Sequence, residues 1–395
     1  MKFKLQLACF TLLLAACTSN NNVIIKNEGQ GKLKASVMLQ VSEEKKIALD
    51  DSTAAKPEYT QIFIDPDKRR YFTFLNSYTN SIYFYDYTTT EYVKKIIWRK
   101  TDLNGVPELK AYHIKSMDSI YIFKKHPHEI VLSNAKGNIL HKKSLMLNPA
   151  DKNWYLKYPQ YLPYTVIPFI ETKHELLLNG FYFGIIPDSI ISKFNFTARL
   201  NFKTNQLRFS NAYPRSLYGH NYNWYSDMLT WVFSDLHPDG NKLVLSFPIS
   251  HDVYIADLNT GKYKKVYAGS NFAGTICSVE SKKKIPTNEE IMQNFMSNDN
   301  YTAIKYDPFR KVYYRFLLKA VSEKLKHKNF KEKPVDIIVM DDNFRYLGET
   351  TIGTWKSWNW QNSFVTKEGL NIEYNVNDPE EKNIILKIFT IKKIK

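Results

Sequence analysis

Apolar residues in this chain come in short runs that are separated by turn residues. In SIYFYD (81–86), DVYIAD (252–257) and DIIVMD (336–341), both of the alternating sets of positions are largely apolar. A strand that keeps one face in water shows apolar and polar residues in alternation, so these three strands are expected to be buried on both faces. The pattern predicts sheets that are packed between other sheets.

A turn that contains proline joins two such strands at three places. The segments are IDPDKRRYFTFL (64–75), LHPDGNKLVLSF (236–247) and YDPFRKVYYRFL (306–317). Proline fixes φ at the second turn position, and Asp, Asn or Gly beside it tolerates the remaining turn geometry. Each segment is therefore predicted to form a β-hairpin.

A second hairpin follows the first, and the whole unit recurs. NSIYFYDYTTTEY (80–92) aligns with HDVYIADLNTGKY (251–263) without a gap, and residues 335–348 repeat the pattern. Less regular copies fill the intervals, with first-hairpin turns near residues 66, 117, 172, 238, 308 and 368. Six units of about sixty residues each therefore account for the chain.

Four-stranded units that are buried on both faces and repeated around an axis are the blades of a β-propeller. We therefore predict an all-β fold, a six-bladed β-propeller with four-stranded antiparallel blades that forms a single domain over residues 32–395. The last unit shows only three strands between residues 363 and 393. An N-terminal strand from KLKASVMLQ (32–40) is predicted to supply the fourth strand and to close the ring.

The first residues predict export and lipidation. A basic N-terminus precedes the apolar run LACFTLLLAA (7–16), which has the length of a signal peptide and is too short to span a bilayer. The sequence LAAC that ends at Cys17 resembles the bacterial lipobox, in which the cysteine thiol carries diacylglycerol. We expect residues 1–16 to be a lipoprotein signal peptide, Cys17 to be lipidated, and residues 17–31 to form a flexible tether.

Charge and cysteine content narrow the classes of partner. Cys277 is the one cysteine of the mature body, so an internal disulfide is not expected. Lys and Arg number 55 against 39 Asp and Glu, which gives a formal net charge of +16. Outside the cytoplasm, this charge favours acidic glycans or anionic lipid over nucleic acid as a partner, although scattered solvated lysines would give the same total.

The lipobox, the Asp-Pro hairpins and the Y-D-x-x-T elements together resemble bacterial lipoproteins of the six-bladed β-propeller type, and most closely the family known as the domain of unknown function 4221. The resemblance implies the fold and a cell-envelope location, and it brings no chemistry. Thr18 after Cys17 favours the outer membrane over the inner one, and a tether without an acidic export signal favours its periplasmic side over the cell surface.

Candidate binding residues gather in long connections that the propeller topology places on one face of the disc. Residues 213–227 and 354–362 are both predicted to be loops between blades. They supply the candidate ligand-binding residues Arg215, His220, Trp224, Tyr225, Asp227, Trp355, Trp358 and Trp360. The aromatic rings could stack on sugars or anchor a protein partner, or they could plug blade interfaces and the central channel.

Two other segments stand out on the same predicted face. Residues 319–334 carry six lysines against two glutamates, which could attract an acidic ligand or form a solvated loop. Residues 286–298 are predicted to form one short helix, because Thr287 and Glu290 make a capping box ahead of an apolar stripe.

Catalytic motifs are absent from the sequence. It contains no G-x-S-x-G, H-E-x-x-H, Walker or EF-hand pattern, and no catalytic residue, metal or cofactor is predicted. His126 and His128 are a weak metal candidate, and His220 with Asp227 and Arg215 is the group we would choose for acid–base chemistry. The favoured interpretation is a non-catalytic, membrane-anchored binding module for a glycan or an envelope protein. The alternatives are a polysaccharide hydrolase or lyase with its site in the central channel, and a structural subunit.

Overall fold

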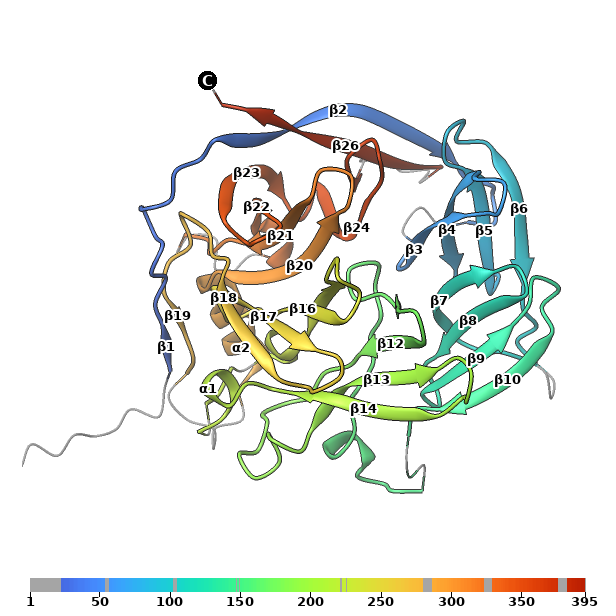
Figure 1. Ribbon diagram of the computed structural model, residues 1–395, viewed down its shortest axis with the longest axis horizontal. Coiled ribbons are helices and arrows are strands. Elements are labelled where there is room, and N and C mark those ends of the chain that lie inside the picture. Colours follow the sequence, from blue (N-terminus) through green and yellow to red (C-terminus); the bar gives the residue numbers. More distant parts are fainter. Residues whose placement is uncertain are drawn as a thin grey trace, which may run out of the picture.

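The computed structural model of the protein describes residues 23–53, 57–101, 105–146, 148, 150–220, 222–224, 226–279, 286–322, 329–375 and 382–394. In this part of the chain, six four-stranded antiparallel sheets are arranged around a central axis (Figure 1). The structure confirms the predicted all-β, six-bladed β-propeller.

The strands follow the order of the chain from blade to blade. The first sheet contains β3 (Thr60–Ile64), β4 (Arg70–Asn76), β5 (Ser81–Asp86) and β6 (Tyr92–Ile97), and the second contains β7 (Leu109–Ser116), β8 (Ser119–Lys124), β9 (Glu129–Ser133) and β10 (Ile139–Ser144). The third contains β11 (Ile170–Glu171), β12 (Glu175–Asn179), β13 (Asn195–Asn201) and β14 (Leu207–Ala212), and the fourth contains β15 (Phe233–Leu236), β16 (Lys242–Ser246), β17 (Asp252–Asp257) and β18 (Tyr263–Tyr267). The fifth contains β20 (Asn300–Asp307), β21 (Val312–Leu318), β22 (Pro334–Asp341) and β23 (Tyr346–Thr354), and the sixth contains β24 (Trp358–Val365), β25 (Leu370–Tyr374), β26 (Asn383–Lys393) and β2 (Val37–Ala48).

The predicted hairpins form because their turns are stabilised locally. The Asp65 carboxylate accepts the backbone N–H of Arg69 at 2.9 Å, and the Asp307 carboxylate accepts the N–H of Phe309 at 2.9 Å. Lys68 and Lys311 take positive φ values of 66° and 55° to complete the two turns. Asp favours such turns because its side-chain oxygens accept hydrogen bonds from backbone N–H groups that lie two to four residues later in the chain.

The N-terminal strand closes the ring as predicted. β2 pairs with β26 in antiparallel register from Val37 opposite Lys393 to Ala48 opposite Asn383 (Figure 1). The strand begins five residues later than the predicted segment and runs on to residue 48, because β26 offers a partner edge eleven residues long. The two ends of the domain are therefore held in one sheet.

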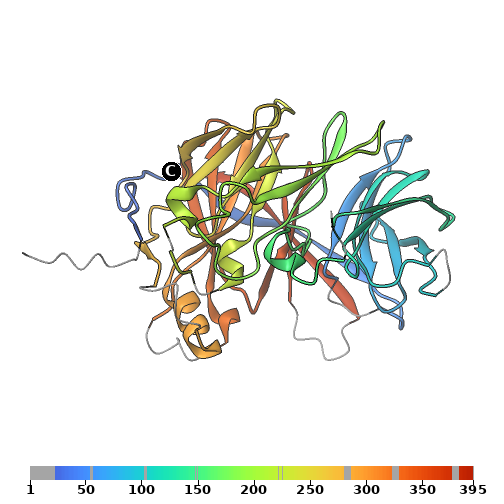
Figure 2. The same ribbon diagram turned by 90° about the horizontal axis from the view of Figure 1, so that it is seen from below.

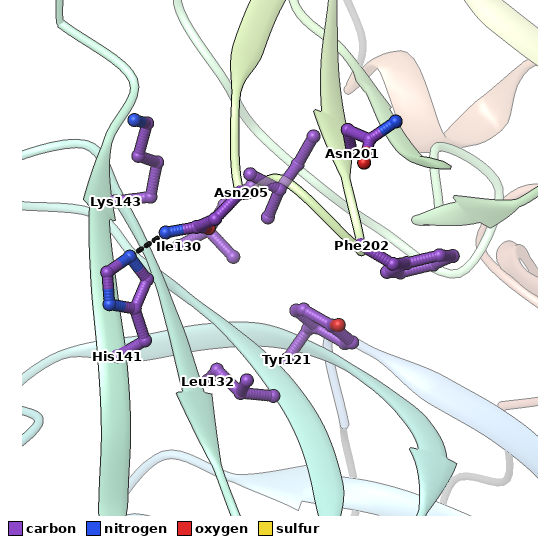
Figure 3. Close-up of a pocket in the computed structure, with 9 residues that line it drawn as sticks. Tyr121, Ile130, Leu132, His141, Lys143, Asn201, Phe202 and Asn205 are labelled. Atoms are coloured by element: carbon purple, nitrogen blue, oxygen red, sulfur yellow. Dashed lines mark hydrogen bonds between the residues drawn. The ribbon is translucent and has the colours of Figure 1, made fainter. Parts of the chain in front are cut away.

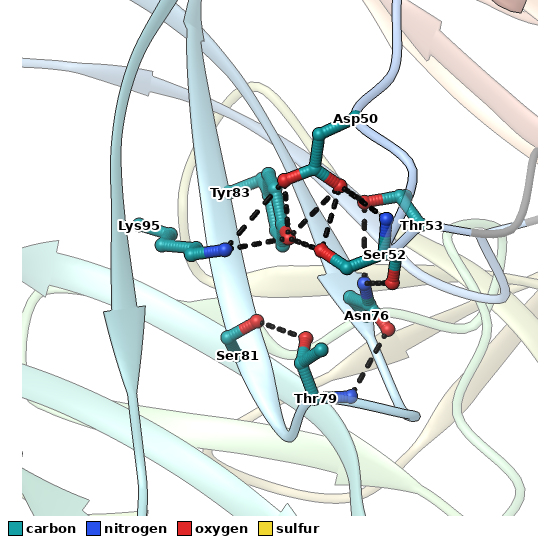
Figure 4. Close-up of polar contacts among 8 residues, drawn as sticks. All are labelled: Asp50, Ser52, Thr53, Asn76, Thr79, Ser81, Tyr83 and Lys95. Carbon is teal, nitrogen blue, oxygen red and sulfur yellow. Dashed lines mark hydrogen bonds and ion pairs between the residues drawn. The ribbon is translucent and has the colours of Figure 1, made fainter. Parts of the chain in front are cut away.

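A polar cluster fastens the end of β2 to the first blade (Figure 4). The Asp50 carboxylate accepts hydrogen bonds from the Ser52 hydroxyl at 2.8 Å and the Tyr83 hydroxyl at 2.9 Å, and the Thr53 hydroxyl donates to it as well. Desolvation opposes ionisation of this carboxyl, but the hydrogen bonds outweigh it and lower the pKa of Asp50 to about 2. The cluster joins the closing strand to the blade that follows it.

Residues 23–31 differ from the expected flexible tether because they are docked on the body. β1 (Ile24–Ile25) pairs with β19 (Ile276–Cys277), and the Asn27 amide donates to the carbonyl oxygens of Ser270 at 2.8 Å and Ala273 at 2.7 Å. Specific side-chain hydrogen bonds therefore fix a segment whose polar composition resembled a linker.

Short helices lie in the connections between strands. α2 (Asn288–Ser297) has the predicted capping box of Thr287 and Glu290, and it buries Phe295 and Met296. The other short helices in the described residues are α1 (Arg215–Tyr218), η1 (Trp154–Leu156), η2 (Asp227–Thr230) and η4 (Phe330–Glu332). Among the described residues, no helix has both the length and the apolar character that a membrane span requires.

The two faces of the disc differ in the connections that they carry. The turns between the first and second and between the third and fourth strands of each blade form one side, which we call the hairpin-turn face. The longer connections form the other side, which we call the long-loop face. In Figure 2, the orange helix α2 marks the long-loop face below, and hairpin tips of the middle blades mark the opposite face above.

The axis of the propeller is occupied by a buried polar network. The side chain of Thr165 bonds to Thr60 of the first blade and to Asn362 of the sixth, at 3.1 Å and 2.7 Å between oxygens. The Lys305 ammonium of the fifth blade donates to the Thr165 carbonyl at 2.9 Å. The segment around Thr165 therefore crosses the centre of the disc and ties three blades together.

Candidate functional site

The predicted tryptophans pack inside the protein. Trp224, Trp355, Trp358 and Trp360 are each at most 8% exposed. Trp358 and Trp360 belong to strand β24, so their predicted placement in a loop was wrong. The Trp355 and Trp360 rings are 5.2 Å apart and the Trp358 and Tyr374 rings are 4.8 Å apart. The rings fill blade interfaces, and a role in ligand contact stays a prediction.

The predicted acid–base group does not assemble as expected. Arg215 pairs with the Asp188 carboxylate at 2.8 Å, and the backbone N–H of His220 donates to the same carboxylate at 2.8 Å. The Asp227 carboxylate instead accepts the N–H of Gly184 at 2.7 Å. Asp188, which no sequence motif marks, is therefore the residue that brings Arg215 and His220 together.

Little room remains beside Trp224 on the long-loop face. A hollow of about 10 Å³ is lined there by Gly184, Ile185, Ile186, Tyr218, Tyr222, Trp224, Ser226 and Thr230. That volume admits at most one water molecule. Tyr225 and the lipidation candidate Cys17 lie outside the described residues.

The histidine pair of residues 126–128 does not form a metal site in the described part of the chain. His128 is buried, and its ring lies 5.0 Å from the ring of Trp154 in an edge-on contact. Burial lowers the pKa of His128 to about 4. Groups of three or more His, Cys, Asp or Glu side chains that could hold a metal do not occur among the described residues.

A larger hollow opens on the hairpin-turn face, between the second and third blades (Figure 3). Its volume is about 220 Å³, and it is lined by Tyr121, Ile130, Leu132, His141, Lys143, Leu200, Asn201, Phe202 and Asn205. Drug-sized pockets occupy roughly 300–1,000 Å³, so this hollow suits a smaller group. The candidates predicted from the sequence lie on the opposite face, and no motif in the sequence pointed to the residues that line this hollow.

The hollow exists because one turn leaves its blade interface incompletely filled. The turn between β13 and β14 repeats those after Asp86 and Asp257, with Asn201 accepting backbone N–H groups in place of aspartate. The residue that follows this Asp or Asn is Tyr87 in the first blade, where it is buried. The equivalent residue in the third blade is Phe202, which stays partly exposed. The Phe202 ring lies 5.5 Å from that of Tyr121, and both border the hollow (Figure 3).

Polar groups surround this apolar floor. The His141 ring is hydrogen-bonded to the Asn205 amide, as Figure 3 shows. The Lys143 ammonium has no hydrogen-bond or ion-pair partner among the described residues, and Lys143 also lines the adjoining hollow beside Glu175 and Arg208. An arrangement of this kind offers both apolar contact and unoccupied hydrogen-bonding capacity.

The surroundings of the hollow carry excess positive charge. Glu175 is paired with both Arg199 and Arg208, and Lys115 is paired with Glu171 and stands 4.3 Å above the Phe202 ring. The hydrogen bonds and charges of the two guanidinium groups overcome desolvation and lower the pKa of Glu175. Lys115, Lys143, Arg199 and Arg208 stand against Glu171 and Glu175, so the local balance is positive by two charges.

Known structures share this architecture. A crystal structure of a member of the DUF4221 family from Bacteroides vulgatus matches with a TM-score of 0.74 and 19% identity, over 91% of this chain and 99% of the other. A Bacteroides fragilis protein whose assigned name is that of an exported protein matches with a TM-score of 0.51 and 12% identity, over 90% and 96% of the two chains. At these identities the likeness supports the fold alone.

The sequence comparisons agree with the fold. No curated protein matches this chain. The family described as domain of unknown function 4221 matches residues 36–351, which runs from the closing strand to the end of the fifth blade. The chain therefore belongs to the domain of unknown function 4221 family.

Proposed function

We propose that the protein is a non-catalytic, membrane-anchored extracytoplasmic binding module that holds one acidic sugar unit of a glycan between its second and third blades. The observation that carries this proposal is the mixed lining of the hollow in Figure 3, where two aromatic rings face a polar and basic rim. The sequence predicted the aromatic residues of the long-loop face as candidates, and because those residues are buried we favour a site on the opposite face.

The aromatic side of the hollow matches the apolar face of a sugar ring. Tyr121 and Phe202 supply ring surface, and Ile130, Leu132 and Leu200 form the floor. Carbon-bound hydrogens on one face of a pyranose pack against such rings, and aromatic side chains supply large contact areas with little loss of conformational freedom. A flat, small ligand with an apolar face is therefore favoured.

The polar rim matches the hydroxyl and carboxylate groups of a uronic acid. The Asn201 side chain keeps its N–H donors, because its oxygen is bonded to backbone N–H groups of the turn, and the Asn205 side chain keeps its oxygen acceptor, because its nitrogen is bonded to His141. Sugar hydroxyls require both kinds of group. Lys143 has three donors to offer a carboxylate, and the positive local balance raises the concentration of anions near the hollow. The net positive charge of the whole chain acts in the same direction.

The lining does not suit glycoside hydrolysis. Glycosidases need two carboxyl groups on either side of the scissile bond, and no Asp or Glu lines the hollow. The alternative site in the central channel is also disfavoured, because the network around Thr165 occupies the axis. Binding without cleavage is the function that this geometry supports best.

The cellular location in this proposal depends on the sequence. The lipobox at Cys17 supports a lipid anchor, and Thr18 favours the outer membrane over the inner one. The tether without an acidic export signal favours the periplasmic side of that membrane. The name of the structurally similar Bacteroides fragilis protein supports export. Metabolic labelling with a palmitate analogue tests the anchor, since labelling should disappear in Cys17→Ala and should persist in Cys277→Ala.

Titration calorimetry with oligouronates and their neutral counterparts tests the binding site. Phe202→Ala should weaken binding at least tenfold, and Lys143→Ala should remove the preference for the acidic sugar. Phe309→Ala is the matched control, because Phe309 is 60% exposed on the same face but belongs to another blade.

Two outcomes would contradict the proposal. Binding that survives Phe202→Ala and fails in Trp224→Phe or Trp358→Phe would restore the long-loop face as the site. Release of unsaturated products from the oligouronate, followed by ultraviolet absorbance, would show a lyase instead of a binding module.

A further inference from the structure

The docked N-terminal segment determines which part of the propeller lies close to Cys17. Val23 is fixed by its N–H, which donates to the Ser278 hydroxyl at 2.9 Å, and by its carbonyl, which accepts the Ser278 N–H at 3.0 Å. Six peptide units separate Val23 from Cys17, and a fully extended chain spans at most about 3.6 Å per residue. A lipid attached at Cys17 therefore holds this edge of the disc within about 22 Å of the membrane.

Two large apolar side chains are exposed along this edge. Ile24 is 56% exposed on β1, and Phe272 is 60% exposed in the loop that precedes β19. The backbone N–H of Gly31 donates to the Asn271 carbonyl at 2.9 Å, which places the docked segment directly beside Phe272. Figure 1 shows β1 and β19 side by side at the rim of the propeller.

The exposure of Phe272 is built into the fold. The Ser270 hydroxyl accepts the N–H groups of Phe272 at 2.9 Å and of Ala273 at 3.0 Å, and it donates to the Glu349 carboxylate at 3.0 Å. Tyr301 accepts the N–H of Ser270 at 3.0 Å. A rigid loop therefore holds the Phe272 ring in solvent, away from the nearby core.

Basic side chains accompany the two apolar ones. Lys26, Lys32 and Lys34 are exposed on the docked segment, which carries Glu28 as its one acidic residue between positions 23 and 36. The Lys319 ammonium stands 5.6 Å from the Phe272 ring centre and also pairs with Asp336 at 3.4 Å. Apolar side chains flanked by lysines are the pattern of surfaces that bind anionic membranes.

We propose that Ile24, Lys26, Lys32 and Phe272 form a membrane-facing patch that contacts the anionic headgroup layer, with the Phe272 ring inserted at its boundary. The contact adds to the covalent anchor and orients the disc. The patch lies on the rim of the disc beside β19, and the second blade, which borders the hollow of Figure 3, lies on the far side of the ring (Figure 1), so the hollow is held away from the lipid.

Vesicle co-sedimentation tests the patch without the lipid anchor. The full mature chain carrying Cys17→Ala should bind vesicles that contain phosphatidylglycerol and should bind phosphatidylcholine vesicles weakly. Phe272→Ser should reduce the partition coefficient about tenfold, since insertion of a phenyl ring accounts for at least that factor. Phe309→Ser is the control, because that ring is equally exposed, at 60%, but lies in the β20–β21 turn of the hairpin-turn face, outside the patch.

A second variant keeps the test independent of the folding of the loop. Lys26→Glu combined with Lys32→Glu should also reduce binding to the anionic vesicles at least tenfold and leave the near-ultraviolet circular dichroism unchanged. The proposal is overturned if the Cys17→Ala chain does not bind anionic vesicles, or if Phe309→Ser reduces binding as much as Phe272→Ser. It is also overturned if the patch variants retain vesicle binding and instead lose self-association or a bound protein.

Discussion

At the scale of single residues, stability depends on buried polar groups that the repeat only partly reveals. The repeat aligns Arg315 in β21 with Thr73 in β4 and Leu245 in β16, so a cation at an otherwise uncharged position could be recognised from the sequence. Its partners could not be recognised, because they are backbone carbonyls in a different blade. The guanidinium donates to the carbonyls of Ser250, at 2.7 Å, and of His251 and Ala268, both at 3.0 Å.

Arg315→Met should therefore lower the free energy of unfolding by about 3 kcal/mol, because several buried carbonyls lose their donors. Arg315→Lys should recover only part of the loss, since an ammonium has fewer donors than a guanidinium and no fork geometry. Urea unfolding followed by tryptophan fluorescence measures both. Arg69→Met is the control, because the Arg69 side chain is 61% exposed. An equal loss in the control would show that the buried network is not the cause.

At the scale of elements, the sequence predicted what local chemistry determines. Hairpins with Asp-Pro turns and the capping box of α2 were recognisable, because their donors and acceptors lie within four residues of one another. The docking of residues 23–31 was not recognisable, because the Asn27 amide meets carbonyl groups more than 240 positions away. Contacts that join distant segments leave no local pattern in a single sequence.

The polar cluster around Asp50, which fastens the end of β2 to the first blade, can be tested directly (Figure 4). Asp50→Asn should lower the free energy of unfolding by about 1 kcal/mol at pH 7, a modest loss because the site is partly open to solvent. The pKa of Asp50 is lowered to about 2, so its contribution is complete above about pH 4 and is lost as the pH falls toward 2. Chemical unfolding at pH 7 and pH 3 measures the effect. Asp51→Asn, at the exposed neighbouring residue, should have little effect on the free energy of unfolding. A similar loss of stability in that variant would contradict the role of the polar cluster around Asp50.

The loop that carries Phe272 should respond to pH through Glu349. Burial raises the pKa of Glu349 from 4.5 to about 7, while its carboxylate bonds to Ser270 and Asn271. A raised pKa means that this carboxyl keeps its proton up to a higher pH in the folded state than in the unfolded chain. The stability contribution is therefore full below about pH 4.5 and is lost as the pH rises to 7.

Glu349→Gln should remove this pH dependence. The difference in unfolding free energy between the wild type and the variant should change by about 2 kcal/mol between pH 4.5 and 7.5, with the wild type losing relative stability as the pH rises. Urea unfolding at four pH values measures it, with Glu28→Gln as an exposed control. Parallel curves for the wild type and Glu349→Gln would show that the carboxyl titrates normally.

At the scale of the whole molecule, repeat counting predicted the ring, whereas the proposed binding site lies on the face opposite to the predicted candidates. The propeller could be predicted from six repeated units whose strands are buried on both faces. Its closure could be predicted because the last unit lacks a fourth strand. The tryptophans lie in sequence segments that resemble loops, yet they are buried between blades. The hollow beside Phe202 depends on how far one turn residue enters a blade interface, where Tyr87 is buried and Phe202 is not. Such a difference in packing has no counterpart in composition or spacing.

A ring closed by one sheet should gain stability when that sheet is sealed covalently. Met38 lies directly opposite Lys392 in the β2–β26 pair, and Met38 is 40% exposed. Met38→Cys with Lys392→Cys should form a disulfide that links the two ends of the domain, and disulfides that close long loops contribute about 2–4 kcal/mol by restricting the unfolded chain. The melting temperature of the oxidised double variant should therefore exceed that of its reduced form, whereas Met38→Ser with Lys392→Ser should not respond to reductant. Equal melting temperatures in the two redox states, with the disulfide confirmed by mass spectrometry, would mean that opening of the ring is not the first step of unfolding and that another blade interface separates before it.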